Sequence, residues 1–224
     1  MSSPFDEIVK ANASHYAALL RRHGDTPAAA QWSDQETQDR RLNVLCEIGD
    51  IRTSRILDFG CGTGRLLTVL RARGFSGTYV GYDVAPAVIE AARAKYPGVT
   101  FECRDILAQG VGGDFDYVLL SGVFNNRHSG SREFVEGVLT TLSSHCQKGL
   151  AFNALSTFVD YFDSDLVYLD PLEMFSFCKT RLSPSAVLRH DYSLKAGVIP
   201  YEYTIYVYPS DLKCRENRSM SNDA

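Results

Sequence analysis

One short segment of the sequence has the residue types and spacing of a ligand-binding loop. Residues 56–66 read ILDFGCGTGRL, an apolar run that ends in Asp58 and is followed by glycine at three alternate positions, Gly60, Gly62 and Gly64. Glycine permits a tight turn and lets a backbone come close to a bound molecule. A helical pattern resumes directly after the loop, and the first turn of a helix presents free N–H groups and a partial positive charge. The segment therefore predicts a ligand site where a strand turns into a helix.

Neighbouring residues limit what this loop can bind. Arg65 stands where a dinucleotide fingerprint would place its third glycine, so the spacing weakens a pyrophosphate site without excluding it. Cys61 lies inside the loop, but no partner base is identifiable for a nucleophilic thiol, and we expect it only to fill space. Asp83 ends the apolar run TYVGYD, 23 positions after Gly60, where a carboxylate can accept both hydroxyls of a ribose. Asp83 thus points to a ribose-containing ligand.

The pattern around these residues predicts alternating strands and helices. From residue 55 on, short apolar runs alternate with stretches of helical periodicity, which implies crossover connections and a parallel sheet with helices on both faces. The segments AVLRHDYS and EYTIYVYP have only LKAGVIPY between them, so they predict an antiparallel pair at the end of the sheet. The predicted strands are RILDFG, TYVGYD, VTFECRD, FDYVLLSG, KGLAFNAL and this final pair.

The first fifty residues differ from the rest, because apolar residues recur there at three- and four-residue spacing. Two helices are expected, joined by HGDTPAAAQWSD, which carries the only tryptophan, Trp32, and an Asp that could cap the second helix. We therefore divide the chain into a helical cap at 1–50, an α/β domain at 51–209 and a polar tail at 210–224. The tail lacks apolar periodicity and is predicted to be disordered.

Composition and charge limit which cellular compartment and which kinds of partner we expect. A length of 224 residues with 45% hydrophobic content suits one well-buried domain. The formal net charge is -4 and no basic run could neutralise a row of phosphates, so nucleic acid is not expected as a partner. No window approaches the ~18 to 20 apolar residues of a membrane span. Six scattered cysteines without a CxxC pair, and an N-terminus without signal-peptide features, favour the cytoplasm, and no metal site is predicted.

Together these segments resemble the class I S-adenosylmethionine-dependent methyltransferases, whose first motif is an acid-x-Gly-x-Gly-x-Gly after the first strand. Residues 58–64 fit that motif at every position, and the resemblance covers residues 50–209. It implies an α/β fold, a three-layer Rossmann-like sandwich with a mostly parallel seven-stranded sheet whose last strand is antiparallel. The N-terminal helices would form a lid on this fold.

The resemblance also implies S-adenosylmethionine as the cofactor and assigns residues to its parts. The glycine loop would border the methionine part, with Asp58 holding the amino group, and Asp83 would accept from the ribose. Asp105 would accept from the adenine amino group while Ile106 packs the ring. A helix cap or a turn is the alternative role for each of these acids. The predicted cofactor-binding residues are Asp58, Gly60, Gly62, Gly64, Asp83, Asp105, Ile106, Ser121 and Trp32.

Residues for the reaction itself are expected in two loops. SGVFNNRHSG follows the fourth strand and departs from the Asp/Asn-Pro-Pro-Tyr/Phe pattern of enzymes that methylate nucleobase or amide nitrogens. In this fold that loop faces the reactive carbon, so Asn125, Asn126 and His128 are candidates to orient a substrate, with a simple turn as the alternative. The long aromatic segment 153–170 predicts either a lid that brings Tyr161 to the pocket or an extra hydrophobic patch.

The leading functional prediction is methyl transfer to a small-molecule metabolite, by alignment of the acceptor with the methyl group and without an obligatory base. The alternative makes the cofactor the substrate. Its α-amine would then attack the γ-carbon of the same molecule, expel methylthioadenosine and form azetidine-2-carboxylate. A binding protein without turnover and a nicotinamide-dependent oxidoreductase are less favoured. The sequence permits an oligomer but does not indicate one.

Overall fold

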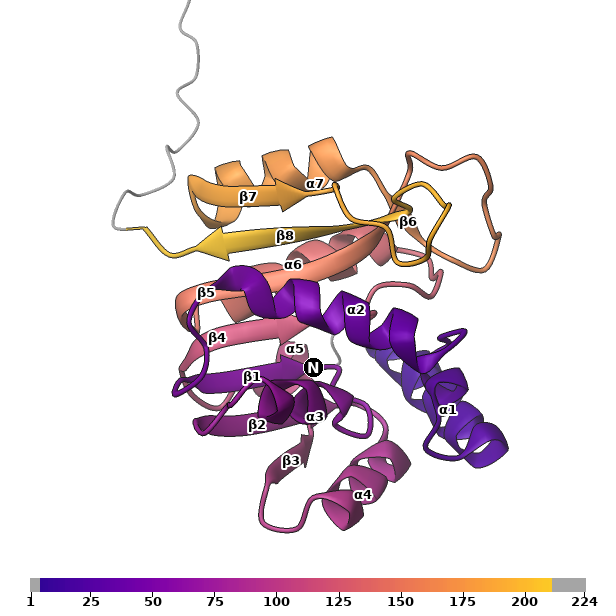
Figure 1. Cartoon of the computed structure of the whole chain (residues 1–224), viewed down its shortest axis with the longest axis vertical. Helices are drawn as coiled ribbons and strands as arrows, with labels where there is room; N and C mark the ends of the chain where they lie inside the picture. The colour runs from indigo at the N-terminus through magenta and orange to yellow at the C-terminus, as the bar shows by residue number, and fades with distance from the viewer. Residues whose placement is uncertain (1–4, 211–224) are drawn as a thin grey trace, which may run out of the picture.

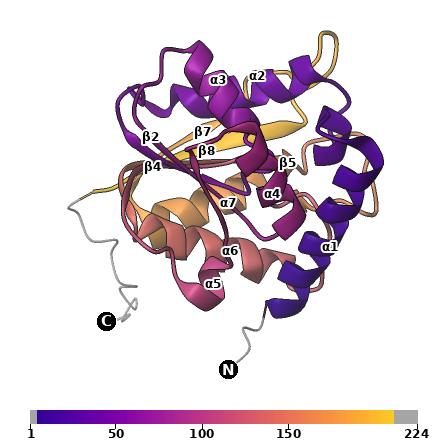
Figure 2. The same ribbon diagram turned by 90° about the horizontal axis from the view of Figure 1, so that it is seen from below.

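The chain forms an eight-stranded mixed sheet between two layers of helices (Figure 1, Figure 2). The computed structural model describes residues 5–210, so the predicted tail at 210–224 lies, apart from Ser210, outside the described residues. Strand order is β3-β2-β1-β4-β5-β8-β7, with β6 pairing to β5 off this path. The strands are β1 (Arg55–Phe59), β2 (Thr78–Asp83), β3 (Thr100–Cys103), β4 (Phe115–Leu120), β5 (Cys146–Ser156), β6 (Tyr168–Leu169), β7 (Ser185–Arg189) and β8 (Glu202–Tyr208).

The predicted sheet, mostly parallel with an antiparallel last strand, is confirmed. β8 runs antiparallel to both β5 and β7, and its pairing with β7 places Ser185 opposite Tyr208. The other ladders described are parallel. The seven strands of the main path are those predicted from the apolar runs. The sequence analysis missed β6, because its two residues are too few to show a strand pattern.

Helices cover both faces of the sheet, as the alternating pattern predicts. Buried residues of α2, α3 and α4 pack with Ile56 on one face, while those of α5, α6 and α7 pack with Leu57 on the other. Neighbouring residues of one strand therefore point into different cores, as the period of a strand requires. The helices are α1 (Asp6–His23), η1 (Pro27–Ala30), α2 (Gln35–Leu45), η2 (Cys46–Ile48), α3 (Arg65–Ala72), α4 (Pro86–Lys95), α5 (Ile106–Gln109), α6 (Ser131–Ser143), α7 (Pro171–Phe177) and η3 (Cys178–Leu182).

The first elements of the chain, α1, η1 and α2, form what we call the roof. α1 and η1 lie beyond the carboxyl ends of the strands, at the right of Figure 1, and α2 continues from them onto the sheet. α1 buries only Ile8, whereas α2 buries residues along its length. Asp34 caps α2 by accepting from the Thr37 N–H at 2.7 Å. Among residues 5–210, no helix is both long and apolar enough to cross a membrane.

A buried ion pair joins the beginning of the chain to its end. Arg41 of α2 donates from Nε to both carboxylate oxygens of Glu202 on β8, at 2.7 and 2.6 Å, and each side chain is 1% exposed. The Tyr192 hydroxyl donates to the same carboxylate at 3.3 Å. A buried charge that loses its partner is costly, so this pair holds α2 in one position on the sheet.

Removing one member of this pair should destabilise the protein far more than removing both. Glu202→Gln leaves the Arg41 charge buried, and we expect the free energy of unfolding in urea to fall by about 3 to 5 kcal/mol. Arg41→Met combined with Glu202→Leu removes both charges at similar volume and should cost much less. Asp50→Asn breaks an exposed pair with Arg52 and serves as the control, with no measurable loss expected. Equal losses for Glu202→Gln and Asp50→Asn would contradict a structural role for the buried pair.

Candidate active site

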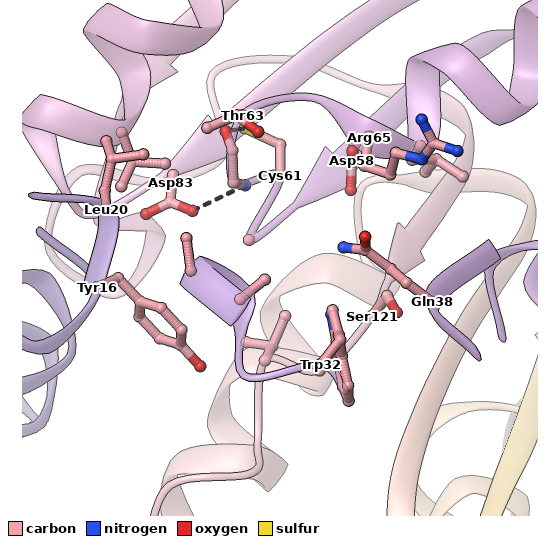
Figure 3. A pocket seen from close by; sticks show the side chains of 18 of the residues that line it. Tyr16, Leu20, Trp32, Gln38, Asp58, Cys61, Thr63, Arg65, Asp83 and Ser121 are labelled. Carbon is pink, nitrogen blue, oxygen red and sulfur yellow. Dashed lines mark hydrogen bonds between the residues drawn. The ribbon is translucent and has the colours of Figure 1, made fainter. Parts of the chain in front are cut away.

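A cavity of about 300 Å³ lies where the carboxyl ends of β1, β2 and β4 meet the roof (Figure 3). The glycine loop, Asp83 and Ser121 line it from the sheet, and Tyr16 and Trp32 line it from the roof. Ligands of open α/β sheets bind at this edge, where the strands end and their helices depart to opposite faces. The volume is of the order that binds small molecules.

A carboxylate from the next strand supports the glycine loop. The Gly62 N–H donates to Asp83 Oδ2 at 3.0 Å (Figure 3), and the Ala85 N–H donates to Asp83 Oδ1 at 3.0 Å. Burial raises the pKa of Asp83, and these N–H groups act against that rise. Gly62 has a φ of 54°, and a Cβ added there would meet no atom within 4 Å. The loop therefore leaves room for a ligand directly against its backbone.

Asp58 presents one carboxylate oxygen to the cavity. Its Oδ2 accepts from the Tyr79 hydroxyl at 2.5 Å, and the residue is 3% exposed. Among the described residues, no group donates to Oδ1. Burial raises the pKa of Asp58 to about 7, the charge of Asp83 adds to the rise, and the bond from Tyr79 acts against it. A cationic ligand group at Oδ1 would favour the ionised carboxylate.

Uncharged side chains tie the roof to the loop after β4. Asn126 Nδ2 donates to the Tyr16 hydroxyl at 3.2 Å, and His128 Nε2 lies 2.9 Å from Asn12 Oδ1. Burial raises the pKa of Tyr16 to about 12 and lowers the pKa of His128, so both side chains are neutral at pH 7. Asn126 and His128 thus contact α1, and neither lines the cavity. Their predicted part in orienting a substrate stays a prediction.

A second set of bonds ties the roof to the glycine loop. The Thr63 hydroxyl donates to Asp25 Oδ1 at 2.5 Å, and Lys95 of α4 pairs with Asp25 Oδ2 at 2.7 Å. Burial acts to raise the pKa of Asp25, but the bonds from Lys95 and Thr63 outweigh it and lower the pKa. The sequence analysis missed this set, because no local pattern connects Asp25 with partners 38 and 70 positions away.

Trp32, between η1 and α2, lines the cavity opposite the Asp58 side (Figure 3). Arg41 Cζ lies 3.5 Å from the centre of a Trp32 ring. The edge of the indole lies over Gly122, because a Cβ added to Gly122 would be 2.6 Å from Trp32 Cζ2. Gly122 also has a φ of 69°, in the left-handed region that favours glycine. Only glycine leaves room for the indole at that position. Gln38 points from α2 toward Asp58 and Ser121.

The predicted site residues do not all meet in the cavity. Those that line it are Asp58, Gly60, Gly62, Asp83, Ser121 and Trp32. Gly64 is the N-cap of α3, and Asp105 is the N-cap of α5, where its side chain accepts two backbone N–H groups above the buried Ile106. Asn125 is 8% exposed and lies near Gly122, just outside the lining. Tyr161 is 73% exposed and does not line the cavity.

Comparison with known proteins identifies the family. Residues 56–149 match a family model described as a methyltransferase domain. The chain is 39% identical over 158 residues to a Mycobacterium tuberculosis protein named methyltransferase Rv1506c, and the match covers 68% of this chain and 91% of that relative. The chain belongs to the class I S-adenosylmethionine-dependent methyltransferases. The resemblance stated from the sequence is confirmed.

Two further similarities place this methyltransferase among its relatives. It is 30% identical over 111 residues to malonyl-(acyl-carrier protein) O-methyltransferase of Acetivibrio thermocellus, a match that covers 47% of this chain and 39% of that relative. A crystal structure of magnesium protoporphyrin IX methyltransferase from Synechocystis PCC 6803 with bound S-adenosylmethionine aligns with a TM-score of 0.65 at 18% identity, over 93% of this chain and 99% of that one. At this identity the structural likeness concerns the fold alone.

S-adenosylmethionine is the cofactor of this methyltransferase, and the cavity has the features to bind it. Asp58 Oδ1 is an acceptor for an ammonium group, and the space at Gly62 admits a ligand against the backbone. Asp83 already accepts two N–H groups, but a carboxylate has about four acceptor positions, which leaves room for hydroxyls. Among residues 5–210, no cluster of three or more His, Cys, Asp or Glu could hold a metal ion.

The raised pKa of Asp58 should make stability depend on pH. An unfolded aspartate has a pKa near 3.9. Between that value and about 7 the folded protein holds a proton that the unfolded chain has lost. The free energy of unfolding should therefore fall as pH rises through this range, by at most about 1.4 kcal/mol per pH unit, and level off above it.

Urea unfolding of the cofactor-free protein between pH 4 and pH 8 measures this dependence. Asp58→Asn stays neutral at every pH and should remove the part of the decline that Asp58 causes, leaving only the part from Asp83, whose pKa burial also raises. Asp160→Asn removes an exposed carboxylate of the same type and should leave the profile of the unmodified protein. Parallel profiles for the unmodified protein and Asp58→Asn would show that Asp58 titrates in its ordinary range.

Proposed function

We propose that this methyltransferase transfers the methyl group of S-adenosylmethionine to a small-molecule acceptor. The observation that carries the proposal is the cavity itself, which the roof covers in part, and whose Cys61 thiol is not activated as a nucleophile because burial holds its pKa well above the usual range. Hydrogen bonds of Asp25, Asn12 and Tyr16 fix the roof to the loops around the cavity. An acceptor that binds beneath the roof must therefore be small. The relative named malonyl-(acyl-carrier protein) O-methyltransferase and others named trans-aconitate 2-methyltransferase support a low-molecular-weight acceptor group.

We assign the cofactor contacts to acceptors that line the cavity and, for adenine, to Asp105 and Ile106, which lie outside that lining. Asp58 Oδ1 receives the amino group, with Gly60, Gly62 and Gly64 shaping the loop beside the methionine part. Asp83 receives the ribose hydroxyls. Asp105 uses Oδ1 to cap α5 and keeps Oδ2 for the adenine amino group, while Ile106 packs beneath the ring. Ser121 and Trp32 complete the set proposed for cofactor contact.

We further propose that the protein acts mainly by holding the acceptor in line with the methyl group. When bound, S-adenosylmethionine supplies a methyl group on a positively charged sulfur. The acceptor would take this methyl group with its lone pair and lose its own proton to water, and the electron pair of the broken carbon–sulfur bond would stay on sulfur. Asn125 orients the acceptor by its amide, and Asn126 and His128 act through the roof that they hold. Alignment of this kind can supply most of the catalysis without a protein base. A role for Tyr161 stays a prediction.

The decisive experiment is mass spectrometry of the purified protein with S-adenosylmethionine and an ultrafiltered small-molecule extract of its host. We expect S-adenosylhomocysteine together with a product that gains one CH₂. The same incubation without extract tests the cyclisation alternative. Release of methylthioadenosine from the cofactor alone would overturn methyl transfer, and S-adenosylhomocysteine formed only with the fraction retained by the filter would overturn a small acceptor.

Replacing Gly62 should weaken cofactor binding through the space that it leaves. Gly62→Ala and Gly74→Ala both put a side chain at a left-handed position with no protein atom within 4 Å, so each should cost about 1 to 2 kcal/mol of stability. Only Gly62 lines the cavity. By calorimetry we expect the Kd for S-adenosylhomocysteine to rise at least tenfold, by about 1.4 kcal/mol, in Gly62→Ala and to stay unchanged in Gly74→Ala. Equal affinities in the two variants would move the cofactor away from this loop.

A further inference from the structure

Two side chains that line the cavity near Asp58 carry hydrogen-bond donors without a partner. They are Gln38 of α2 and Ser121, which follows β4. Gln38 points from α2 toward Asp58 and Ser121 (Figure 3). An amide or a hydroxyl group can both donate and accept, so its surroundings decide which role it has toward a ligand. The hydrogen bonds around these two side chains fix that role.

The role of Gln38 is set by its neighbours on α2. Gln35 Nε2 donates to Asp39 Oδ1 at 3.0 Å, and the same oxygen accepts from Arg65 Nε at 2.8 Å. An ionised carboxylate only accepts, so the end of the Gln35 amide that meets it is the NH₂ group. The same nitrogen donates to Gln38 Oε1 at 3.0 Å. The oxygen of Gln38 is therefore taken, and its NH₂ group, which bonds none of the described residues, is free for a ligand.

The role of Ser121 is set from β5. The backbone N–H of Gly122 donates to Asn153 Oδ1 at 2.9 Å, which identifies the oxygen end of this buried amide. The other end is the NH₂ group, and it donates to Ser121 Oγ at 3.2 Å. Ser121 Oγ accepts there, and no residue in the described part of the chain takes its own proton. Asn153 thus makes Ser121 a donor toward the cavity.

These two donors lie beside one free acceptor. Asp58 is 3% exposed, and its Oδ2 takes the Tyr79 proton while Oδ1 accepts from no described residue. The first turn of α3 also borders the cavity, through Arg65 and Leu66, and no side chain caps it. Its free N–H groups add a partial positive charge. An acceptor for a cation next to donors for an anion complements an α-amino acid, whose ammonium and carboxylate groups share one carbon.

We propose that Gln38 and Ser121 bind the carboxylate of the cofactor's methionine part while Asp58 binds its ammonium group. The proposal deepens the proposed function and rests on it. Asn153 is a positioning residue, because it acts through Ser121. The two donors select S-adenosylmethionine over its decarboxylated form, which keeps the amine, the sulfonium and the nucleoside but offers them no anion.

This contact makes the roof a part of the cofactor site. Gln38 belongs to α2, whose position on the sheet depends on the pair of Arg41 and Glu202, whereas Ser121 follows β4. A carboxylate has enough acceptor positions for both donors. It therefore bridges the roof and the sheet when it binds. A ligand without this carboxylate can occupy the rest of the cavity but leaves the bridge unmade.

The first test compares two ligands that differ in one group. Calorimetry gives the Kd of S-adenosylhomocysteine and of its decarboxylated form, which keeps the amine. Gln38→Met and Ser121→Ala each remove one donor, and each should raise the Kd of S-adenosylhomocysteine about tenfold, the effect of one hydrogen bond to a charged group. The Kd of the decarboxylated form should stay within about twofold. Gln147→Met, at an exposed position of β5 outside the cavity, is the matched control and should change neither value.

A charge at position 38 gives a sharper test. Gln38→Glu keeps an oxygen that accepts from Gln35 and replaces the NH₂ group by a second oxygen at nearly the same volume. This oxygen repels the carboxylate of S-adenosylhomocysteine and meets no anion in the decarboxylated form. We expect the order of the two affinities to reverse in this variant, so that the decarboxylated form binds more tightly. A purely structural role of Gln38 would change both affinities alike.

The outcomes separate this inference from the proposed function. Gln38 is only half-buried, so its variants should unfold in urea as the unmodified protein does. An unchanged ratio of the two Kd values in both Gln38 variants would overturn the inference and leave the proposed function intact. Failure of the unmodified protein to bind either ligand would overturn the proposed function and the inference together.

Discussion

The ion pair between Arg41 and Glu202 decides where the roof lies. The two residues are 161 positions apart, yet they share a space with almost no access to water, so α2 can occupy only the position in which both charges are paired. That position brings Gln38 over Asp58 and stacks the guanidinium on Trp32. The cavity is therefore a consequence of how the first fifty residues dock on the last strand, as much as of the glycine loop.

The residues that line the cavity from the sheet could be predicted, because the sequence patterns that mark them are local. The alternating glycines and the acids at strand ends follow from the turn that joins a strand to a helix, so Asp58, Gly62 and Asp83 are found in the cavity. The strands and the antiparallel direction of the last one could be predicted too, since apolar runs separated by helices imply parallel neighbours and the final two runs have no helix between them. A cytoplasmic location and the absence of nucleic-acid partners remain predictions of composition.

The helices of the roof were predicted but their contacts could not be, because these contacts join distant residues without a shared pattern. Asn12 meets His128 across 116 positions, and Tyr16 meets Asn126 across 110. The sequence predicted these two loop residues beside the reactive carbon, and it predicted Tyr161 either in a lid over the pocket or in an extra hydrophobic patch. In the structure, the first two bond α1, and Tyr161 is mostly exposed. Spacing shows which residues share a loop but not which way a loop faces.

The match to the family covers the sheet side of the cavity but not the roof. The family model covers residues 56–149, which end at the start of β5 and contain neither the roof nor Glu202. Trp32, which lines the cavity from the roof, lies before this region, and Glu202, which holds α2 in place, lies after it. The family match therefore concerns the sheet side of the cavity and not the side that the roof forms.

The slight burial of α1 has a consequence for how fast the enzyme can work. Only Ile8 of this helix is buried, and the polar contacts of Asn12 and Tyr16, near its middle, hold it over the cavity, so lifting it exposes little apolar surface. A segment with so little buried surface opens at low cost in free energy. Where product release requires this opening, the lifetime of the closed helix, which amide hydrogen exchange along residues 6–23 would record, sets an upper limit on the turnover number.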